Sequence, residues 1–314
     1  MTTLRRLWSS DATLTATGLL RLAALSGFVA GLWLDPRVIT GAPAWLKPAK
    51  FAVSIAIYTL TLAWIFTYLR DWPRMRRIVG RTTALVLILE LAIIALQAWR
   101  GTTSHFNVGT LLDGVLFAVM GTAIVVQTLT SVAVAVALWR QVFADRALGW
   151  ALRLGMVITN IGASTGGLMT QPTSAQLADA RAGQRMTISG AHTVGAADGG
   201  PGLPGTGWSR EHGDVRVPHF LGLHAMQALP LILFLIARRR RPDAQRIRLT
   251  WVAAASYFAL FAILLAQALG GEALTTPSGT TMAAFAAWAL GTAGGAWIAV
   301  SGAVATRRTA VVLG

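Results

Sequence analysis

Long apolar runs alternate with short polar segments along most of the chain. The runs predict eight helices, at about 15–34, 50–69, 82–99, 110–138, 149–170, 219–237, 250–269 and 281–304. A helix needs about 20 residues to cross the hydrocarbon core of a bilayer, and most of these runs reach that length. They lack the residue-by-residue alternation of a membrane β-barrel. The pattern therefore predicts an all-α, polytopic membrane helix bundle, with residues 1–314 forming a single transmembrane domain.

Composition agrees with a membrane protein. Hydrophobic residues make up 54% of the chain and charged residues 12%, whereas soluble domains carry about 25% charged residues. The net charge of +15 comes from basic residues in short segments between apolar runs, where such residues orient helices. We therefore exclude nucleic acid and expect the lipid bilayer as the main partner. The chain has no cysteine, which excludes disulfides and iron–sulfur clusters.

The basic residues also predict an orientation. Arginines gather in alternate segments, around Arg5, Arg76, Arg146, Arg240 and Arg307. Cytoplasmic loops carry the excess of Lys and Arg, so we expect both termini inside and an even number of helices. The long Gly- and Pro-rich segment 171–218 then lies outside, between the fifth and sixth helices. Loops of this length are usually functional or disordered, and its Trp and Val residues favour an ordered cap.

All histidines fall on this predicted outer side. They are His105, His192, His212, His219 and His224. Imidazole is a common ligand of Zn, Cu, Fe and haem iron, so this distribution predicts a metal or haem b site near the outer face. The alternative is that interfacial histidines only form hydrogen bonds with loop backbone.

One subset resembles a zinc site with three histidines and one carboxylate. It combines His105, Asp113, His219 and His224, and it is similar in type to the membrane hydrolases related to alkaline ceramidases and adiponectin receptors. Those enzymes place their late histidine pair four residues apart, whereas here the gap is five. Asp113 also fits a carboxylate that stabilises a helix start. Gln227 lies three residues after His224 and shares its helix face.

Glu90 is the ionisable residue nearest the middle of a predicted span. A charged group at that depth costs about 2.5–3.5 kcal/mol, so it usually faces a partner or a cavity. Gln97 lies seven residues later on the same face, in the direction of His105. This stripe predicts a proton relay or a solute path. The alternative is a protonated carboxyl group that bonds a neighbouring helix, for example at Asn160.

Four further features are weaker signals. Lys47 and Lys50 precede the second helix on the outer side, where they either attract an anionic substrate or quinone headgroup or extend to lipid phosphates. Pro230 is expected to kink the sixth helix, and Gly162 and Gly166 predict close helix packing. The glycine-rich run 198–209 lacks the Gly-Lys-Ser/Thr ending of a phosphate loop, so we exclude nucleotide binding.

Three motifs carry a resemblance to known proteins: WLKPAKF, the glutamate of the third helix followed by QAWRGTTSHFN, and DGGPGLPGTGWS followed by GDVRVPHFLGLHAMQALP. Together they resemble a group of uncharacterised bacterial multi-pass integral membrane proteins, over 41–107 and 192–232. The resemblance implies a bacterial inner-membrane protein and no particular activity.

Three hypotheses follow. The first is a haem- or metal-dependent membrane enzyme, an oxidoreductase using a quinone or another lipid-soluble substrate, or a zinc-type hydrolase. His105, His219 and His224 would be ligands assisted by His192 or His212. Glu90 and Asp113 would be catalytic residues, Gln97 and Gln227 would bind the cofactor with the histidines, and Glu90 and Gln97 would supply protons from within the bilayer. The second is a proton-coupled small-solute transporter that uses Glu90. The third is a non-catalytic scaffold or pH sensor.

Overall fold

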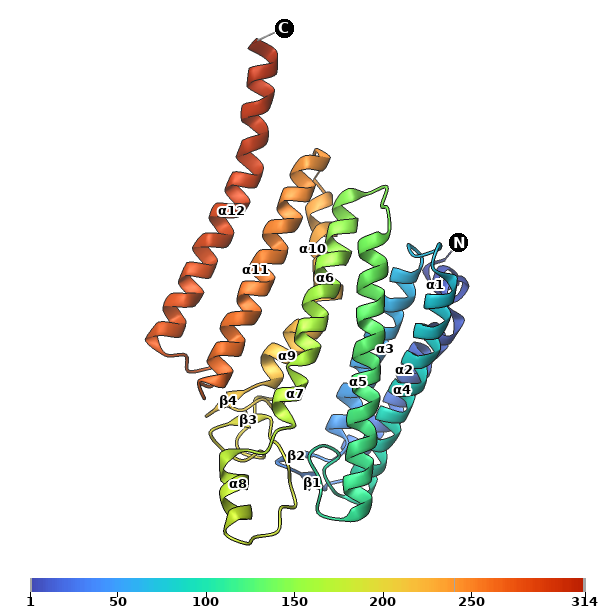
Figure 1. Cartoon of the computed structure of the whole chain (residues 1–314), viewed down its shortest axis with the longest axis vertical. Helices are drawn as coiled ribbons and strands as arrows, with labels where there is room; N and C mark the ends of the chain where they lie inside the picture. Colours follow the sequence, from blue (N-terminus) through green and yellow to red (C-terminus); the bar gives the residue numbers. More distant parts are fainter. Residues whose placement is uncertain (1, 240, 313–314) are drawn as a thin grey trace.

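Long helices run roughly side by side along one axis of the molecule (Figure 1). The computed structural model describes residues 2–239 and 241–312, with side chains described up to residue 301. The long helices are α2 (Ala12–Leu34), α3 (Leu46–Phe66), α4 (Pro73–Arg100), α5 (Leu111–Arg140), α6 (Arg146–Ser164), α11 (Asp243–Leu269) and α12 (Gly279–Val312). A short helix, α1 (Thr3–Ser10), precedes α2. The predicted all-α helix bundle is confirmed.

Six of these helices are long and apolar enough to cross a membrane, and the count rises to seven if the bent pair described below forms one span. The predicted segment 149–170 is different, because it breaks at Thr165 into α6 and the one-turn α7 (Gly166–Met169). Helix α6 carries arginines yet lies at the centre of the bundle, packed against α5, α10 and α11. Since its neighbours cover it, α6 needs less apolar surface than a helix that faces lipid.

The outer faces of the bundle are apolar. Large side chains such as Leu85, Leu129, Trp33 and Trp297 are exposed on the long helices. Exposed apolar patches of this extent are uncommon on soluble monomers. The faces are therefore consistent with a protein embedded in a lipid bilayer.

The predicted sixth helix is broken into α9 (Arg216–Leu223) and α10 (Ala225–Ala237), which meet at 55°. The break lies at His224, six residues before Pro230, which is buried inside α10. Side chains satisfy the backbone at the break. The Tyr257 hydroxyl donates to the Leu221 carbonyl at 2.6 Å, and the Thr159 hydroxyl accepts from the Met226 N–H at 3.0 Å. Such compensation is what permits a break inside a membrane bundle.

The segment 171–218 has regular structure and forms a cap over one end of the bundle. It contains α8 (Ser174–Arg181), which begins with a capping box formed by Thr173 and Gln176. It also contains β3 (Thr193–Val194), which pairs antiparallel with β4 (Gly213–Asp214). Helix α8 lies at the opposite end of the molecule from α1 (Figure 1).

Backbone contacts attach the cap to three parts of the bundle. The Ser189 N–H donates to the Phe106 carbonyl in the α4–α5 loop, and the Gly213 N–H donates to the Gly271 carbonyl after α11. The third contact is with the turn between β1 (Val38–Ile39) and β2 (Ala42–Pro43). There Gly41 has a φ of +71°, and a Cβ at this position would lie 2.4 Å from the Gly199 carbonyl oxygen. Glycine at this turn therefore permits the cap to approach it.

Candidate functional site

The C-terminal half of α4 places a buried carboxylate beside a loop histidine. Glu90 is 3% exposed, and its Oε1 lies 3.7 Å from Nε2 of His105. The second carboxylate oxygen, Oε2, is buried and has no hydrogen-bond partner among the described residues. The separation of 3.7 Å is too long for a hydrogen bond, so the two groups lie near each other without being bonded.

The His105 ring is fixed by its neighbours. Its Nδ1 lies 3.0 Å from the Ser104 hydroxyl, and the ring packs between Phe51 and Phe106. Burial lowers the pKa of His105 well below its usual value, and the positive charge of Lys47 lowers it further. The His105 side chain is nevertheless 22% exposed to solvent. The low pKa keeps the imidazole neutral near neutral pH, so one ring nitrogen can donate a hydrogen bond and the other can accept one.

Phe106 connects His105 to the cap. Its backbone has a φ of +64°, a conformation that non-glycine residues rarely adopt. The ring is buried and lies 4.8 Å, between centroids, from the ring of His192. A strained residue of this kind persists only where the surrounding structure holds it.

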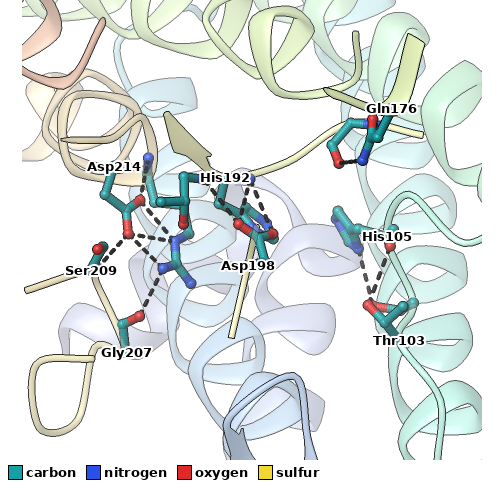
Figure 2. Close-up of polar contacts among 12 residues, drawn as sticks. Thr103, His105, Gln176, His192, Asp198, Gly207, Ser209 and Asp214 are labelled. Carbon is teal, nitrogen blue, oxygen red and sulfur yellow. Dashed lines mark hydrogen bonds and ion pairs between the residues drawn. The ribbon is translucent and has the colours of Figure 1, made fainter. Parts of the chain in front are cut away.

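His192 and Asp198 form a close pair in the cap (Figure 2). The His192 Nδ1 and the Asp198 Oδ2 are 2.5 Å apart, and the same carboxylate accepts the N–H groups of His192 and Thr193. Burial raises the pKa of Asp198, but the hydrogen bond and charge of His192 outweigh burial, so the pKa lies below its usual range. Burial lowers the pKa of His192, and Asp198 opposes this effect in part. The carboxylate therefore fixes the orientation of the ring.

Two lysines of α3 face the same region. Lys47 lies within electrostatic range of Glu90 and Asp198, and its amine makes no hydrogen bond with any residue the structure describes. Lys50 donates to the Thr206 carbonyl of the cap at 2.6 Å. Both lysines are partly buried. Their side chains therefore do not extend to lipid phosphates, which was one of the two predicted roles. We refer to Glu90, Lys47, His105, His192 and Asp198 as the outer charge cluster.

A second ion pair lies in the cap next to the outer charge cluster. Arg216 and Asp214 are joined by two parallel hydrogen bonds, of 2.9 and 2.5 Å. Asp214 also accepts the Ser209 N–H, and Arg216 donates to the Gly207 carbonyl. In Figure 2, the His192–Asp198 pair lies between this group and His105. The Arg216–Asp214 pair therefore connects the glycine-rich run 198–209 to the start of α9.

His219 lies where two broken helices meet. Its Nδ1 donates to the Gly162 carbonyl at 2.9 Å and lies 3.1 Å from the Thr165 hydroxyl. The carbonyl can only accept, so the proton is on Nδ1 and Nε2 is left free. His224, at the next break, packs on the ring of Phe220 at 4.3 Å. The two histidines therefore have different surroundings.

The remaining predicted residues lie elsewhere. Gln97 does not continue the stripe to His105, because it donates to Asp113 at 2.9 Å. Asp113 also pairs with Arg100 at 2.5 Å and bonds to Thr110 at the start of α5. This is the alternative role weighed for Asp113, a carboxylate at a helix start. Asn160 donates to the Met156 carbonyl and forms no bond with Glu90.

Two other predicted residues have no part in the outer charge cluster. In the cap, the His212 backbone N–H bonds to Ser209, and no hydrogen bond of its ring is found among the described residues. In α10, Gln227 has a buried Oε1 without a partner in the same part of the chain.

Metal ligation requires several ligands to converge on one point. Among the residues that the structure describes, no three His, Asp or Glu side chains are placed to hold a metal ion. The metal and haem hypotheses therefore rest on the sequence pattern alone.

Sequence reasoning missed several members of the site. Asp198 was part of a glycine-rich run that was compared only with a phosphate loop, and Phe106 gave no signal because its strain is a property of the backbone. Lys47 was considered, and the signal was its position on the outer side, against the usual preference of lysine. Comparison of the chain with protein-family models, with curated proteins and with solved structures gave no match.

Proposed function

We propose that this chain is a proton-coupled membrane transporter of a small anionic solute, located in a bacterial inner membrane. The observation that carries the proposal is Glu90, a carboxylate buried within a helix of the bundle, with one oxygen unpaired among the described residues and the other facing His105. Ionisable groups at such positions usually belong to proton or solute pathways.

The proton route runs through His105. A proton taken up at the partly exposed imidazole passes from Nε2 to Oε1 of Glu90 once a small rotation brings the two atoms within hydrogen-bond distance. The low pKa of His105 favours this transfer. His192 and Asp198 lie on the cap side of Phe106, where they position the cap over the entry to this route.

The anion preference follows from the basic groups. Lys47 is close to Glu90 and has no hydrogen-bond partner in the described part of the chain. When Glu90 is protonated, the positive charge of Lys47 is no longer balanced by this carboxylate. A small anion bound beside Lys47 restores the balance, so proton uptake and anion binding favour each other.

Two broken helices supply the means of opening. The break between α6 and α7 at Thr165 contacts His219 of α9, next to the break at His224. Transporters commonly place discontinuous helices at the substrate site, where short segments tilt during alternating access.

The test is anion-driven proton uptake in liposomes loaded with a pH-sensitive dye. A panel of small carboxylates and inorganic anions is supplied outside. We expect at least one anion to acidify the lumen. Glu90→Gln abolishes the signal because the amide cannot carry a proton, and Lys47→Gln raises the anion concentration needed for half-maximal uptake.

Glu272→Gln is the matched control, since this carboxylate lies after α11 and, among the described residues, bonds Ser278 and Thr281. The proposal fails if no anion drives proton uptake, or if Glu90→Gln retains it. Elemental analysis and a visible spectrum on the same sample test the metal hypothesis. A stoichiometric transition metal or a haem band that is lost in His105→Gln would replace the transport proposal.

A further inference from the structure

The end of the bundle opposite the cap has a polar hollow of about 280 Å³. One wall is the α1–α2 junction, with Ser10, Asp11 and Thr13. The other wall is the first two turns of α4, with Arg76, Arg77 and Arg81. Small-molecule sites begin at roughly 300 Å³, so the hollow suits a group of the size of a phosphate headgroup.

Its charge is positive. Three guanidinium groups face one carboxylate, and that carboxylate is already engaged. Asp11 Oδ1 accepts the Leu14 N–H at 2.9 Å, which caps α2. Arg77 and Arg81 are four residues apart on one face of α4, where like charges repel each other unless an anion lies between them.

Two buried polar groups in the hollow are unsatisfied. Arg76 donates through Nη2 to the Ser10 carbonyl, while its Nε is buried without a partner within the described residues. The Ser10 hydroxyl is likewise buried without a hydrogen-bond partner among the described residues. A buried unpaired donor costs about 1–3 kcal/mol, so a small shift of these side chains that lets a ligand oxygen accept their bonds stabilises this end of the protein.

We propose that this hollow binds a phosphate group, that of an anionic lipid headgroup. Arginine is suited to phosphate because its planar donors match two phosphate oxygens. The lipid source is favoured by α1, on which Leu4 and Trp8 are exposed beside Arg5 and Arg6. A short helix with this distribution lies in the interface of an anionic membrane, so acyl chains of a bound lipid have an apolar surface to follow. This site is independent of the transport proposal.

The experiment is thermal unfolding of the full chain in detergent. Three additions are compared: phosphatidylglycerol, phosphatidylcholine and inorganic phosphate. We expect phosphatidylglycerol to raise the melting temperature in a saturable way and phosphatidylcholine to have no effect. Arg77→Gln combined with Arg81→Gln weakens apparent binding by about tenfold or more, because two charge-assisted contacts are lost. Both side chains are exposed, so the variant is expected to fold.

Arg74→Gln is the control, since Arg74 is an exposed arginine of the same helix that does not line the hollow. It should leave phosphatidylglycerol binding unchanged. Inorganic phosphate is compared directly with phosphatidylglycerol. If both raise the melting temperature equally and the double variant loses this effect, the phosphate site stands but its assignment to a lipid is overturned. Equal loss in Arg74→Gln, or stabilisation by phosphatidylcholine, would overturn the site itself.

Discussion

Glu90 illustrates how a costly side chain is accommodated. A charged carboxylate inside a bundle needs a positive neighbour or a proton. The structure provides both options, with Lys47 in electrostatic range and His105 at 3.7 Å. Oε2 has no hydrogen-bond partner within the described residues, so no such bond has to break when this oxygen gains or loses a proton. A carboxyl group whose role is only to join two helices is expected to form hydrogen bonds with the neighbouring helix through both of its oxygens.

Asp198 has a structural role, because its hydrogen bonds with the described residues lie within the cap. Asp198→Asn removes the charge that accepts three N–H donors. Charged hydrogen bonds contribute about 1.5–3 kcal/mol, so the variant should open the cap about tenfold or more often. Limited trypsin cleavage at the exposed Arg181 and Arg185 measures this opening.

Glu211→Gln provides the comparison, since Glu211 is an exposed carboxylate of the same cap. Unchanged cleavage in Asp198→Asn, or equal acceleration in Glu211→Gln, would show that the His192–Asp198 pair does not hold the cap.

Functional residues could be predicted from the sequence where their residue type is unusual at the predicted depth in the membrane. Glu90 and His105 were identified because an acid in a span and a histidine above it are uncommon. Gln97 and Asp113 were placed at the correct end, but their partners depend on how α4 packs on α5. Arg21 was overlooked although it lies in α2, is 6% exposed and has two buried nitrogens without partners among the described residues.

At the element scale, the contact between α6 and α9 depends on two glycines. A Cβ at Gly162 would lie 2.5 Å from the Cα of Gly222. Gly162→Ala must therefore separate the two helices near His219, at an overpacking cost of about 1–3 kcal/mol. We expect a lower melting temperature and reduced transport.

The control for this variant is Gly121→Ala in α5, where nothing lies within 4 Å of the added Cβ. Alanine there is neutral or stabilising because of its higher helix propensity. A Gly162→Ala protein as stable as Gly121→Ala would contradict the close crossing of α6 and α9.

The elements themselves were largely predictable, because apolar length defines a membrane helix. The break at His224 was not. It depends on Tyr257 and Thr159, from α11 and α6, which satisfy the freed backbone groups. A proline is visible in the sequence, whereas a break stabilised by distant side chains is not, so Pro230 was singled out and His224 was not.

At the scale of the whole molecule, the two ends differ in charge chemistry. The capped end gathers histidines with lowered pKa values, and the opposite end gathers arginines. In the unfolded chain, His105 and His192 take up protons near their ordinary pKa of about 6.5. The folded state takes them up only at lower pH, so it binds fewer protons in this interval and its stability falls as pH drops below about 6.5.

Melting temperature as a function of pH tests this dependence. We expect a decline below pH 6.5 that is shallower in His105→Gln and in His192→Gln. The lowered pKa of Asp198 adds a further loss at more acid pH, as the carboxylate is protonated. A melting temperature that is constant between pH 7 and 5, or a slope unaffected by both variants, would contradict the buried positions of these histidines.

Proton exchange at Glu90 is tested most directly by an infrared difference spectrum between high and low external pH, recorded on the purified protein in lipid. We predict a carbonyl band of a protonated carboxyl group that is absent in Glu90→Gln, retained in Glu272→Gln and slower to appear in His105→Gln. The same band in Glu90→Gln, or no band in the wild type, would contradict a proton route through Glu90.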